Sequence, residues 1–171
     1  MPTQSIIVIG GGPGGCVAAC RLREHGFEVT LVEAARFPRD KVCGECVSTL
    51  GLAALASAGL GETFNALTPN LLRRVSVVSR GGRSFDANLP QPMAGVTRRV
   101  MDVALLDAAR QRGVNVLQPA KARLVDGGVE VRRLDTGQTR TLAADLVVLA
   151  DGKSNFDHRP TPTGDFGLKV H

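Results

Sequence analysis

The chain has 171 residues, of which 43% are hydrophobic and 22% charged, values that are ordinary for a soluble globular protein able to bury a core. Its formal net charge is +5, but the basic residues are scattered in pairs and the only aromatic residues are six Phe, which argues against a nucleic-acid partner. No uncharged apolar stretch is long enough for a transmembrane segment, and the apolar residues 6–20 lack the preceding cation of a signal peptide.

The first predicted elements form a βαβ unit. Residues 5–9 are a continuous apolar run, which is typical of a strand buried on both faces of a parallel sheet. A run of glycines follows, and then a helix that begins near Cys16 and ends at His25 and Gly26, where glycine can adopt the left-handed conformation. A second strand at residues 28–33 completes the unit.

The middle of the chain is predicted to leave this simple alternation. Residues 34–46 do not resemble a helix, because proline, glycine and charged residues interrupt them. A helix of small residues is predicted over 47–58. Residues 75–79 and 83–86 read as two strands joined by a Gly-Gly turn.

A second helix is predicted from Arg98 to Arg112, with Thr97 as its N-cap and Gly113 after its end. Its predicted apolar face consists of Val100, Met101, Ala104, Leu105 and Ala108.

The remaining predicted elements are strands. One covers residues 114–118, three short strands near 121–126, 129–133 and 139–143 form an antiparallel meander, and residues 145–150 form another buried parallel strand.

The glycine turn after the first strand carries the strongest functional signal. Gly10, Gly12 and Gly15 fit the pattern G-x-G-x-x-G between a predicted strand and a predicted helix. Such glycines allow the tight turn, the approach of a pyrophosphate to the backbone, and close helix–strand packing. Glu33, at the end of the next strand, can accept hydrogen bonds from ribose hydroxyls and disfavours the 2′-phosphate of NADP. This context favours a dinucleotide site over an ordinary strand-to-helix turn.

The order of elements and three stretches of sequence resemble a family of flavoenzymes. Residues 37–45 look like the F-P-R-x-K-x-C-G-E stretch of geranylgeranyl reductases and their flavin-dependent halogenase and monooxygenase relatives. Residues 98–105 look like that group's R-x-x-x-D-x-x-L helix, and residues 150–154 resemble its A-D-G-x-x-S turn. The K-x-C-G-E piece is the most specific of these matches.

The resemblance implies an α/β fold: a Rossmann-like FAD-binding domain with a parallel sheet, a glycine-rich βαβ start and a three-stranded antiparallel meander. The expected organisation is a first part of the FAD-binding domain over 1–70, part of a β-rich substrate region over 71–96, the second part of the FAD-binding domain over 97–155, and the start of an incomplete region over 156–171. Family members are much longer, so we expect this chain to lack the part that performs the chemistry.

The resemblance also implies roles for individual residues. Gly12, Gly14 and Glu33 would bind the ADP half of FAD, Arg98 would lie on its pyrophosphate side, and Ala122 would offer backbone contacts to adenine. Cys43 and Gly44 would lie near the flavin, and Asp151 and Gly152 would brace the cofactor region. The full set of candidate cofactor-binding residues is Gly10, Gly12, Pro13, Gly14, Gly15, Glu33, Ala34, Arg39, Lys41, Cys43, Gly44, Arg98, Ala122, Asp151 and Gly152. No catalytic residue is identified, and Gly164-Asp165 is not assigned to the second Gly-Asp motif of these enzymes.

The activity implied for the whole protein is FAD-dependent hydride or electron transfer, with NAD(P)H as donor and a small molecule or lipid, an unsaturated isoprenoid, as acceptor. Two alternatives remain open: a flavin-dependent monooxygenase or halogenase, and a non-catalytic dinucleotide-binding fragment. We also expect the fragment to expose an apolar face and to self-associate.

The four cysteines lie between positions 16 and 46, a poor disulfide framework, so reduced thiols and a cytoplasmic location are expected. Cys43 and Cys46 form a C-x-x-C that lacks the two further ligands of a zinc site. It is compatible with a redox dithiol, as in a thioredoxin-reductase-like enzyme, or with incidental thiols. Cys16 and Cys20 share a helical face and are expected to pack in the core.

Overall fold

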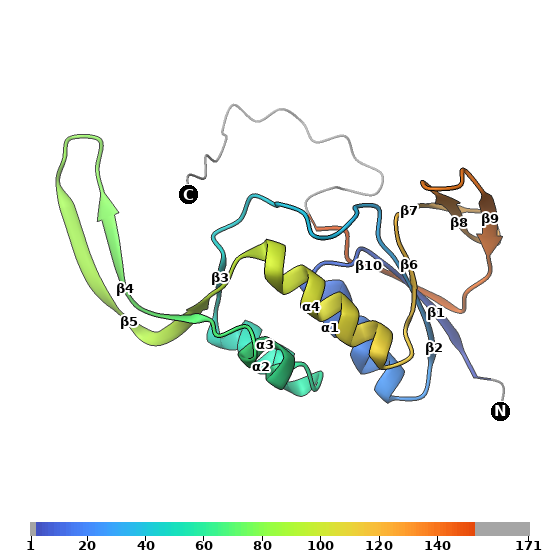
Figure 1. Ribbon diagram of the computed structural model, residues 1–171, viewed down its shortest axis with the longest axis horizontal. Helices are drawn as coiled ribbons and strands as arrows, with labels where there is room; N and C mark the ends of the chain where they lie inside the picture. Colours follow the sequence, from blue (N-terminus) through green and yellow to red (C-terminus); the bar gives the residue numbers. More distant parts are fainter. Residues whose placement is uncertain (1–2, 153–171) are drawn as a thin grey trace.

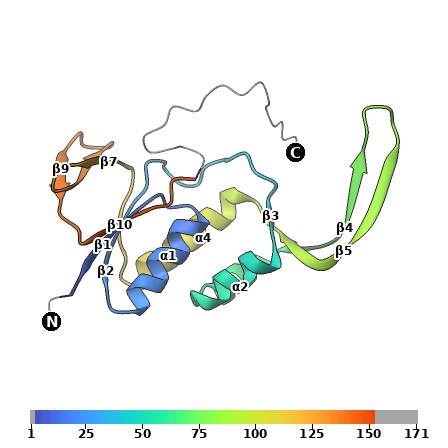
Figure 2. The same ribbon diagram turned by 180° about the vertical axis from the view of Figure 1, so that it is seen from behind.

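The computed structural model describes residues 3–152, and a four-stranded parallel sheet lies next to its helices, at the end of the molecule away from the long hairpin (Figures 1 and 2). The strand order is β10-β1-β2-β6, and every neighbouring pair is parallel. The strands are β1 (Ser5–Ile9), β2 (Glu28–Val32), β6 (Asn115–Leu117) and β10 (Leu146–Leu149). Because the chain first moves from β1 to β2 and later places β10 on the other side of β1, the order reverses at the carboxyl end of β1.

Helices cover one face of this sheet. The helices α1 (Pro13–Glu24) and α4 (Arg98–Gln111) lie side by side, and the shorter α2 (Thr49–Ser57) and α3 (Gly61–Asn65) pack beside them (Figure 1). The main core is formed where Val8 and Leu31 of the sheet meet buried residues of these helices, among them Leu105 and Phe64.

An antiparallel meander covers the other face. It consists of β7 (Ala120–Val125), β8 (Gly128–Arg133) and β9 (Thr139–Leu142), which confirms the three predicted strands. Ile7 and Ile9 point to this side, where they pack with Val129 and Val131 in a second core. Side chains of β1 therefore alternate between two buried layers, which is why the strand reads as a continuous apolar run.

A long hairpin projects from the body of the molecule (Figure 2). Its strands β4 (Asn70–Val78) and β5 (Ser84–Gly95) are longer than the predicted strands, and the two-residue β3 (Cys46–Val47) pairs with the end of β5. The hairpin exposes large apolar side chains, namely Leu71, Val75, Val77, Val78 and Phe85. Such a surface is consistent with the expected self-association, which stays a prediction.

The structure corrects several predictions. Val100 is 49% exposed, and the buried face of α4 instead includes the fully buried Asp102. The helix predicted over 47–58 begins only at Thr49, because the preceding residues form β3. The short α3 was not predicted.

Two further expectations hold only in part. The strand β10 is parallel as predicted, but its Leu146 and Leu149 are exposed because β10 is the edge of the sheet among residues 3–152. Thr97 is the N-cap of α4, yet its side chain makes no capping hydrogen bond within the described part of the chain. The Glu45 carboxylate accepts a hydrogen bond from the Arg98 amide at 3.3 Å instead.

Within residues 3–152, no helix combines the length and apolarity that a membrane span requires.

Candidate functional site

In the glycine turn between β1 and α1, neighbouring backbone atoms leave no space for a side chain at two positions. Gly10 has a φ of +110°, and a Cβ there would lie 2.4 Å from the carbonyl oxygen of Ala150. A Cβ on Gly15 would lie 1.8 Å from the carbonyl oxygen of Gly10. Both distances are far below van der Waals contact with rigid backbone atoms, so these glycines allow β1, β10 and α1 to meet.

The other glycines of the motif leave the start of α1 open. Gly12 is the N-cap and Pro13 occupies the first turn, where its missing N–H is no loss. A Cβ on Gly14 would meet nothing within 4 Å. The first-turn amides of a helix lack intrahelical acceptors and carry about half a positive charge, which suits a phosphate at this exposed backbone.

Glu33 lies beside this turn and is oriented by the backbone. It is only 7% exposed, its Oε2 accepts a hydrogen bond from the Gly11 amide at 2.6 Å, and its Oε1 accepts one from the Ala35 amide at 2.7 Å. A carboxylate has about four acceptor positions. Glu33 can therefore hold the turn and still accept hydrogen bonds from a ligand's hydroxyl groups.

Gly11 is a residue of the site that the motif did not reveal, since it occupies a variable position of G-x-G-x-x-G. A Cβ on Gly11 would lie 2.9 Å from the Cβ of Glu33. Its lack of a side chain lets the Glu33 carboxylate reach the turn. Only the packing of β2 against the turn shows this requirement.

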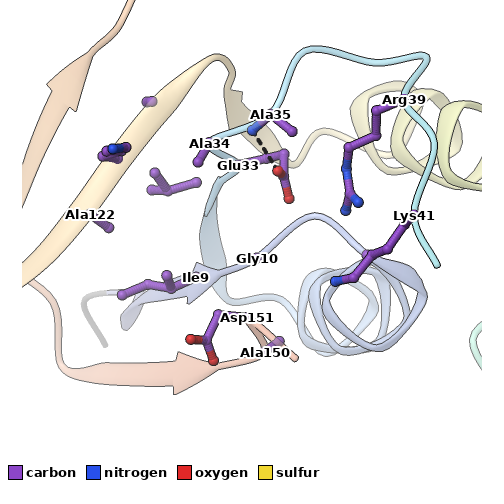
Figure 3. Close-up of a pocket in the computed structure, with 14 residues that line it drawn as sticks. Ile9, Gly10, Glu33, Ala34, Ala35, Arg39, Lys41, Ala122, Ala150 and Asp151 are labelled. Carbon is purple, nitrogen blue, oxygen red and sulfur yellow. Dashed lines mark hydrogen bonds between the residues drawn. The ribbon is translucent and has the colours of Figure 1, made fainter. Parts of the chain in front are cut away.

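A cavity of about 410 Å³ opens at the carboxyl ends of the parallel strands (Figure 3). This is the place where the strand order reverses, which is where open α/β sheets bind their ligands. It is lined by candidate residues from five segments of the chain, namely Gly10, Gly12, Glu33, Ala34, Arg39, Lys41, Ala122 and Asp151, together with Ile9, Val32, Ala35, Ala120, Lys121 and Ala150. Lys121 is not among the site residues predicted from the sequence. It is an exposed residue of a meander strand, and no motif marks it as part of a ligand site.

A second cavity, of about 470 Å³, opens at the start of α1, beside Pro13 and Gly14. Five further candidate residues line it, namely Pro13, Gly14, Cys43, Gly44 and Arg98, and its apolar wall includes Val17, Leu55 and Met101. Of the candidates, only Gly15 and Gly152 line neither cavity: the first is packed against Gly10, and the second has a φ of +77° and lies beside the Lys41 ammonium group.

The sequence matches the FAD binding domain family over residues 3–157. The chain belongs to this family. It is 29% identical over 157 residues to menaquinone reductase of Mycobacterium tuberculosis strain H37Rv, covering 88% of this chain and 38% of that protein. It is 31% identical over 174 residues to tryptophan 2-halogenase of Chondromyces crocatus, covering 97% of this chain and 31% of that protein.

Solved structures agree with this assignment. A myxobacterial chondrochloren halogenase superposes with a TM-score of 0.76 at 25% identity, over 89% of this chain and 38% of that chain. A flavoprotein/dehydrogenase from Cytophaga hutchinsonii gives 0.73 at 27% identity, over 88% of this chain and 39% of that chain. The chain therefore spans less than two fifths of the length of these relatives. The predicted Rossmann-like FAD-binding fold is confirmed.

The geometry fits FAD independently of the family match. A diphosphate needs bare backbone amides, which the turn at Gly12 and Gly14 provides. A ribose needs an acceptor, which Glu33 provides from its fixed position at the cavity wall. An adenine needs an apolar recess, and Ala120 and Ala122 at the start of β7 line the same cavity.

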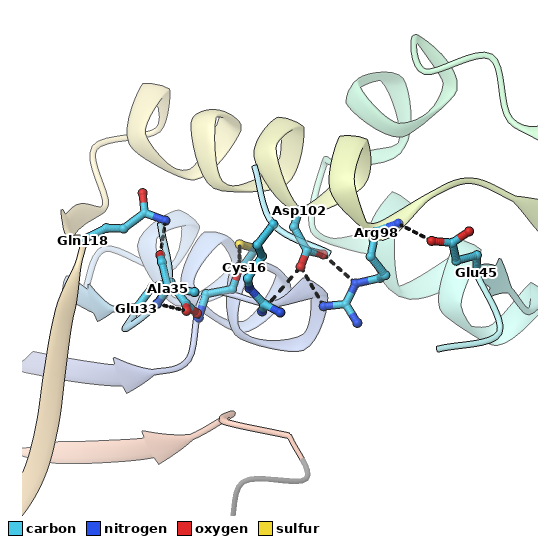
Figure 4. A network of polar contacts seen from close by, with 9 residues as sticks. Cys16, Glu33, Ala35, Glu45, Arg98, Asp102 and Gln118 are labelled. Atoms are coloured by element: carbon cyan, nitrogen blue, oxygen red, sulfur yellow. Dashed lines mark hydrogen bonds and ion pairs between the residues drawn. The ribbon is translucent and has the colours of Figure 1, made fainter. Parts of the chain in front are cut away.

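Asp102 of α4 joins Arg98 and Arg39, which line the two cavities, in a network of charged side chains (Figure 4). The Asp102 carboxylate accepts hydrogen bonds from Arg98 Nε at 2.6 Å and Nη2 at 2.8 Å, and Arg39 Nη2 lies 3.6 Å from its Oδ2. Burial lowers the pKa of Arg98, but the hydrogen bonds and charge of Asp102 outweigh this and raise it overall. The spacing of Arg98 and Asp102 is the i, i+4 pairing of a helix, a signal present in the sequence.

The loop with the C-x-x-C sequence is tied to this network. The Glu45 carboxylate bonds to the Arg98 amide, and the Glu45 carbonyl accepts a hydrogen bond from the Val96 amide. This contact joins the family-like stretches at 37–45 and 98–105, far apart in sequence. All four thiols are free, and residues 3–152 contain no group of three or more His, Cys, Asp or Glu residues that could hold a metal ion.

The cysteines are expected to react in two classes. Burial raises the pKa of both Cys16 and Cys20, and nearby negative groups raise the pKa of Cys16 further. The Cys16 Sγ lies 3.4 Å from the Gly11 carbonyl oxygen. Because the thiolate is the reactive form, we expect two thiols per chain, Cys43 and Cys46, to react rapidly with a disulfide reagent at pH 8, and the other two only on unfolding. Replacing Cys46→Ser should lower the rapid class to one, whereas four rapid thiols would contradict this assignment.

Proposed function

We propose that this chain binds the ADP half of FAD in the cavity beside Glu33 and that the whole protein is an FAD-dependent oxidoreductase. The observation that carries the proposal is the open glycine turn, which faces a cavity whose wall holds an anchored carboxylate. When bound, the flavin supplies the hydride or electron chemistry, and the protein binds and orients it.

Seven of the candidate residues have a proposed task. The first-turn amides at Gly12 and Gly14 hold the diphosphate, Glu33 holds the adenosine ribose, and the Ala122 backbone contacts adenine. Arg98 and the Cys43-Gly44 turn line the second cavity. We propose that this cavity continues the site from the diphosphate toward the flavin.

Support for the reaction comes from the relatives. One is named menaquinone reductase, and another, digeranylgeranylglycerophospholipid reductase 2 of Methanopyrus kandleri, is 30% identical over 152 residues and covers 86% of this chain and 37% of that protein. We propose by analogy that the whole protein reduces an unsaturated isoprenoid-like lipid, with NAD(P)H as the electron donor. The hairpin within 71–96 would belong to the substrate region, and the segments on either side of it to the FAD-binding domain.

A flavin-dependent monooxygenase or halogenase is the second candidate. Squalene monooxygenase of Rattus norvegicus is 27% identical over 162 residues, covering 86% of this chain and 28% of that protein, and the two halogenases named above are 31% and 25% identical. Reducing the flavin of the whole protein without oxygen separates the two. In a reductase, an isoprenoid lipid would reoxidise the reduced flavin in the absence of oxygen. A monooxygenase or halogenase would form product only after oxygen is admitted.

The cofactor assignment predicts a simple binding pattern. Purified protein should be yellow, should release FAD on denaturation, and in its flavin-free form should bind FAD and ADP in calorimetric titrations. FMN, which lacks the adenosine part, should bind at least about tenfold more weakly, because it cannot use the Glu33 contact. A protein that binds ADP and NAD but never acquires a flavin spectrum would support the non-catalytic alternative, and one that prefers FMN would contradict the assignment.

A further inference from the structure

Asp102 is the most deeply buried charged residue of the site, and nothing in its position suits direct contact with a ligand. Its side chain has no solvent exposure and it lines neither cavity. A buried carboxylate is costly unless cations and hydrogen bonds compensate it. Its presence on the core face of α4 therefore calls for a role beyond packing.

The partners of Asp102 are two arginines that reach the two cavities. Arg98 binds it through Nε and Nη2, and a Cβ on Gly12 would lie 3.4 Å from that same Nη2, so this guanidinium adjoins the glycine turn. Arg98 lines the second cavity, and Arg39 lines the first. One carboxylate thus binds a cation at the wall of each cavity.

Arg39 depends on Asp102 for its orientation. Its Nη2 lies 3.6 Å from Asp102, its guanidinium stands over the Phe37 ring at 5.0 Å from the centroid, and its Nε is buried without a hydrogen-bond partner among the described residues. The segment that carries it has no helix or strand to hold it. The ion pair and the ring contact are therefore what hold this guanidinium at the cavity wall.

The charge balance favours an anionic ligand. The first cavity is lined by three cations, Arg39, Lys41 and Lys121, and by two carboxylates, Glu33 and Asp151, so it carries one positive charge in excess. Because an arginine that is already held in place loses less side-chain entropy when it binds a phosphate, its fixed position strengthens binding.

We propose that Asp102 is a positioning residue for the diphosphate: it holds Arg39 at the wall of the first cavity and Arg98 at the wall of the second, with both guanidiniums ready to meet the phosphates. This inference rests on the proposed binding of the ADP half of FAD. Asp102 would contribute to recognition of the diphosphate charge without touching the diphosphate.

The test compares ADP with adenosine, which lacks the phosphates, in flavin-free protein. Asp102→Asn keeps the shape of the side chain but removes its charge and turns an amide N–H toward the guanidiniums. We expect the affinity for ADP to fall by about tenfold or more while the affinity for adenosine changes by less than about threefold. Asp107→Asn is the matched control, since Asp107 lies on the same helix and pairs with Arg110 on the exposed surface.

The outcomes separate the inference from the proposed function. Equal losses of affinity for ADP and adenosine would mean that Asp102 supports only the fold. Unchanged or tighter ADP binding would mean that the Asp102 charge merely weakens the positive potential of the two arginines. Either result overturns the inference while the ADP site stands. If the unaltered protein does not bind ADP at all, the proposed function itself fails.

A second set of variants covers the case in which Asp102→Asn does not fold. Arg39→Lys and Arg98→Lys keep both positive charges but lose the fork geometry of the guanidinium. Because both arginines are held by one carboxylate, their effects on ADP affinity should be non-additive by about threefold or more in a double-mutant cycle. Simple additivity would overturn the inference.

Discussion

Replacing Gly15→Ala is expected to destabilise the protein by more than about 3 kcal/mol, measured as the free energy of unfolding in urea. The added Cβ would lie 1.8 Å from the Gly10 carbonyl oxygen, a backbone atom that can move only if α1 separates from β1. Since the helix start and the cavity share this junction, the affinity for FAD should fall together with stability.

The neighbouring glycine is the matched control for this effect. A Cβ on Gly14 meets nothing within 4 Å, and alanine is a better helix former than glycine by up to about 1 kcal/mol. Gly14→Ala should therefore leave the free energy of unfolding equal or slightly higher. If both variants unfolded at the same urea concentration, the closeness of the Gly10 carbonyl oxygen would not be the reason that position 15 requires glycine.

Replacing Glu33→Gln is expected to weaken FAD and ADP binding by about 30-fold, that is, by about 2 kcal/mol. One of the two carboxylate oxygens becomes an amide group that must face the Gly11 or the Ala35 N–H, so one buried hydrogen bond is lost. The remaining amide is also a weaker acceptor for ribose hydroxyls. Calorimetry on the flavin-free protein measures the change directly.

A second ligand separates recognition from a general loss of structure. The Glu33 carboxylate should repel a 2′-phosphate, so the protein should bind ADP far better than adenosine 2′,5′-bisphosphate, and Glu33→Gln should reduce this preference by about tenfold or more. Glu28→Gln, on the exposed start of the same strand, should change neither affinity. An unaltered preference in Glu33→Gln would argue against contact with the ribose.

The sequence alone determined the features that depend on local spacing. Three glycines at fixed intervals after an apolar strand predicted the open helix start, because such a turn leaves no room for side chains at these positions. The meander strands were predicted for the same reason, since glycine turns bound short alternating segments. The order of these elements, with the three family-like stretches, was sufficient to indicate FAD rather than NAD.

Other features depended on contacts between residues distant in sequence, which no local pattern encodes. Val100 was assigned to the core because it is apolar, yet the packing of α4 places Asp102 there, since Arg98 and Arg39 compensate its charge. The need for glycine at position 11 arises only where β2 brings Glu33 against the turn. The division of the candidate residues between two cavities likewise follows from where the segment 37–46 crosses the end of the sheet. Spacing along the chain fixed the backbone that receives the diphosphate, whereas the tertiary structure decided which charged side chains surround it, because their burial has to be balanced by partners from other elements.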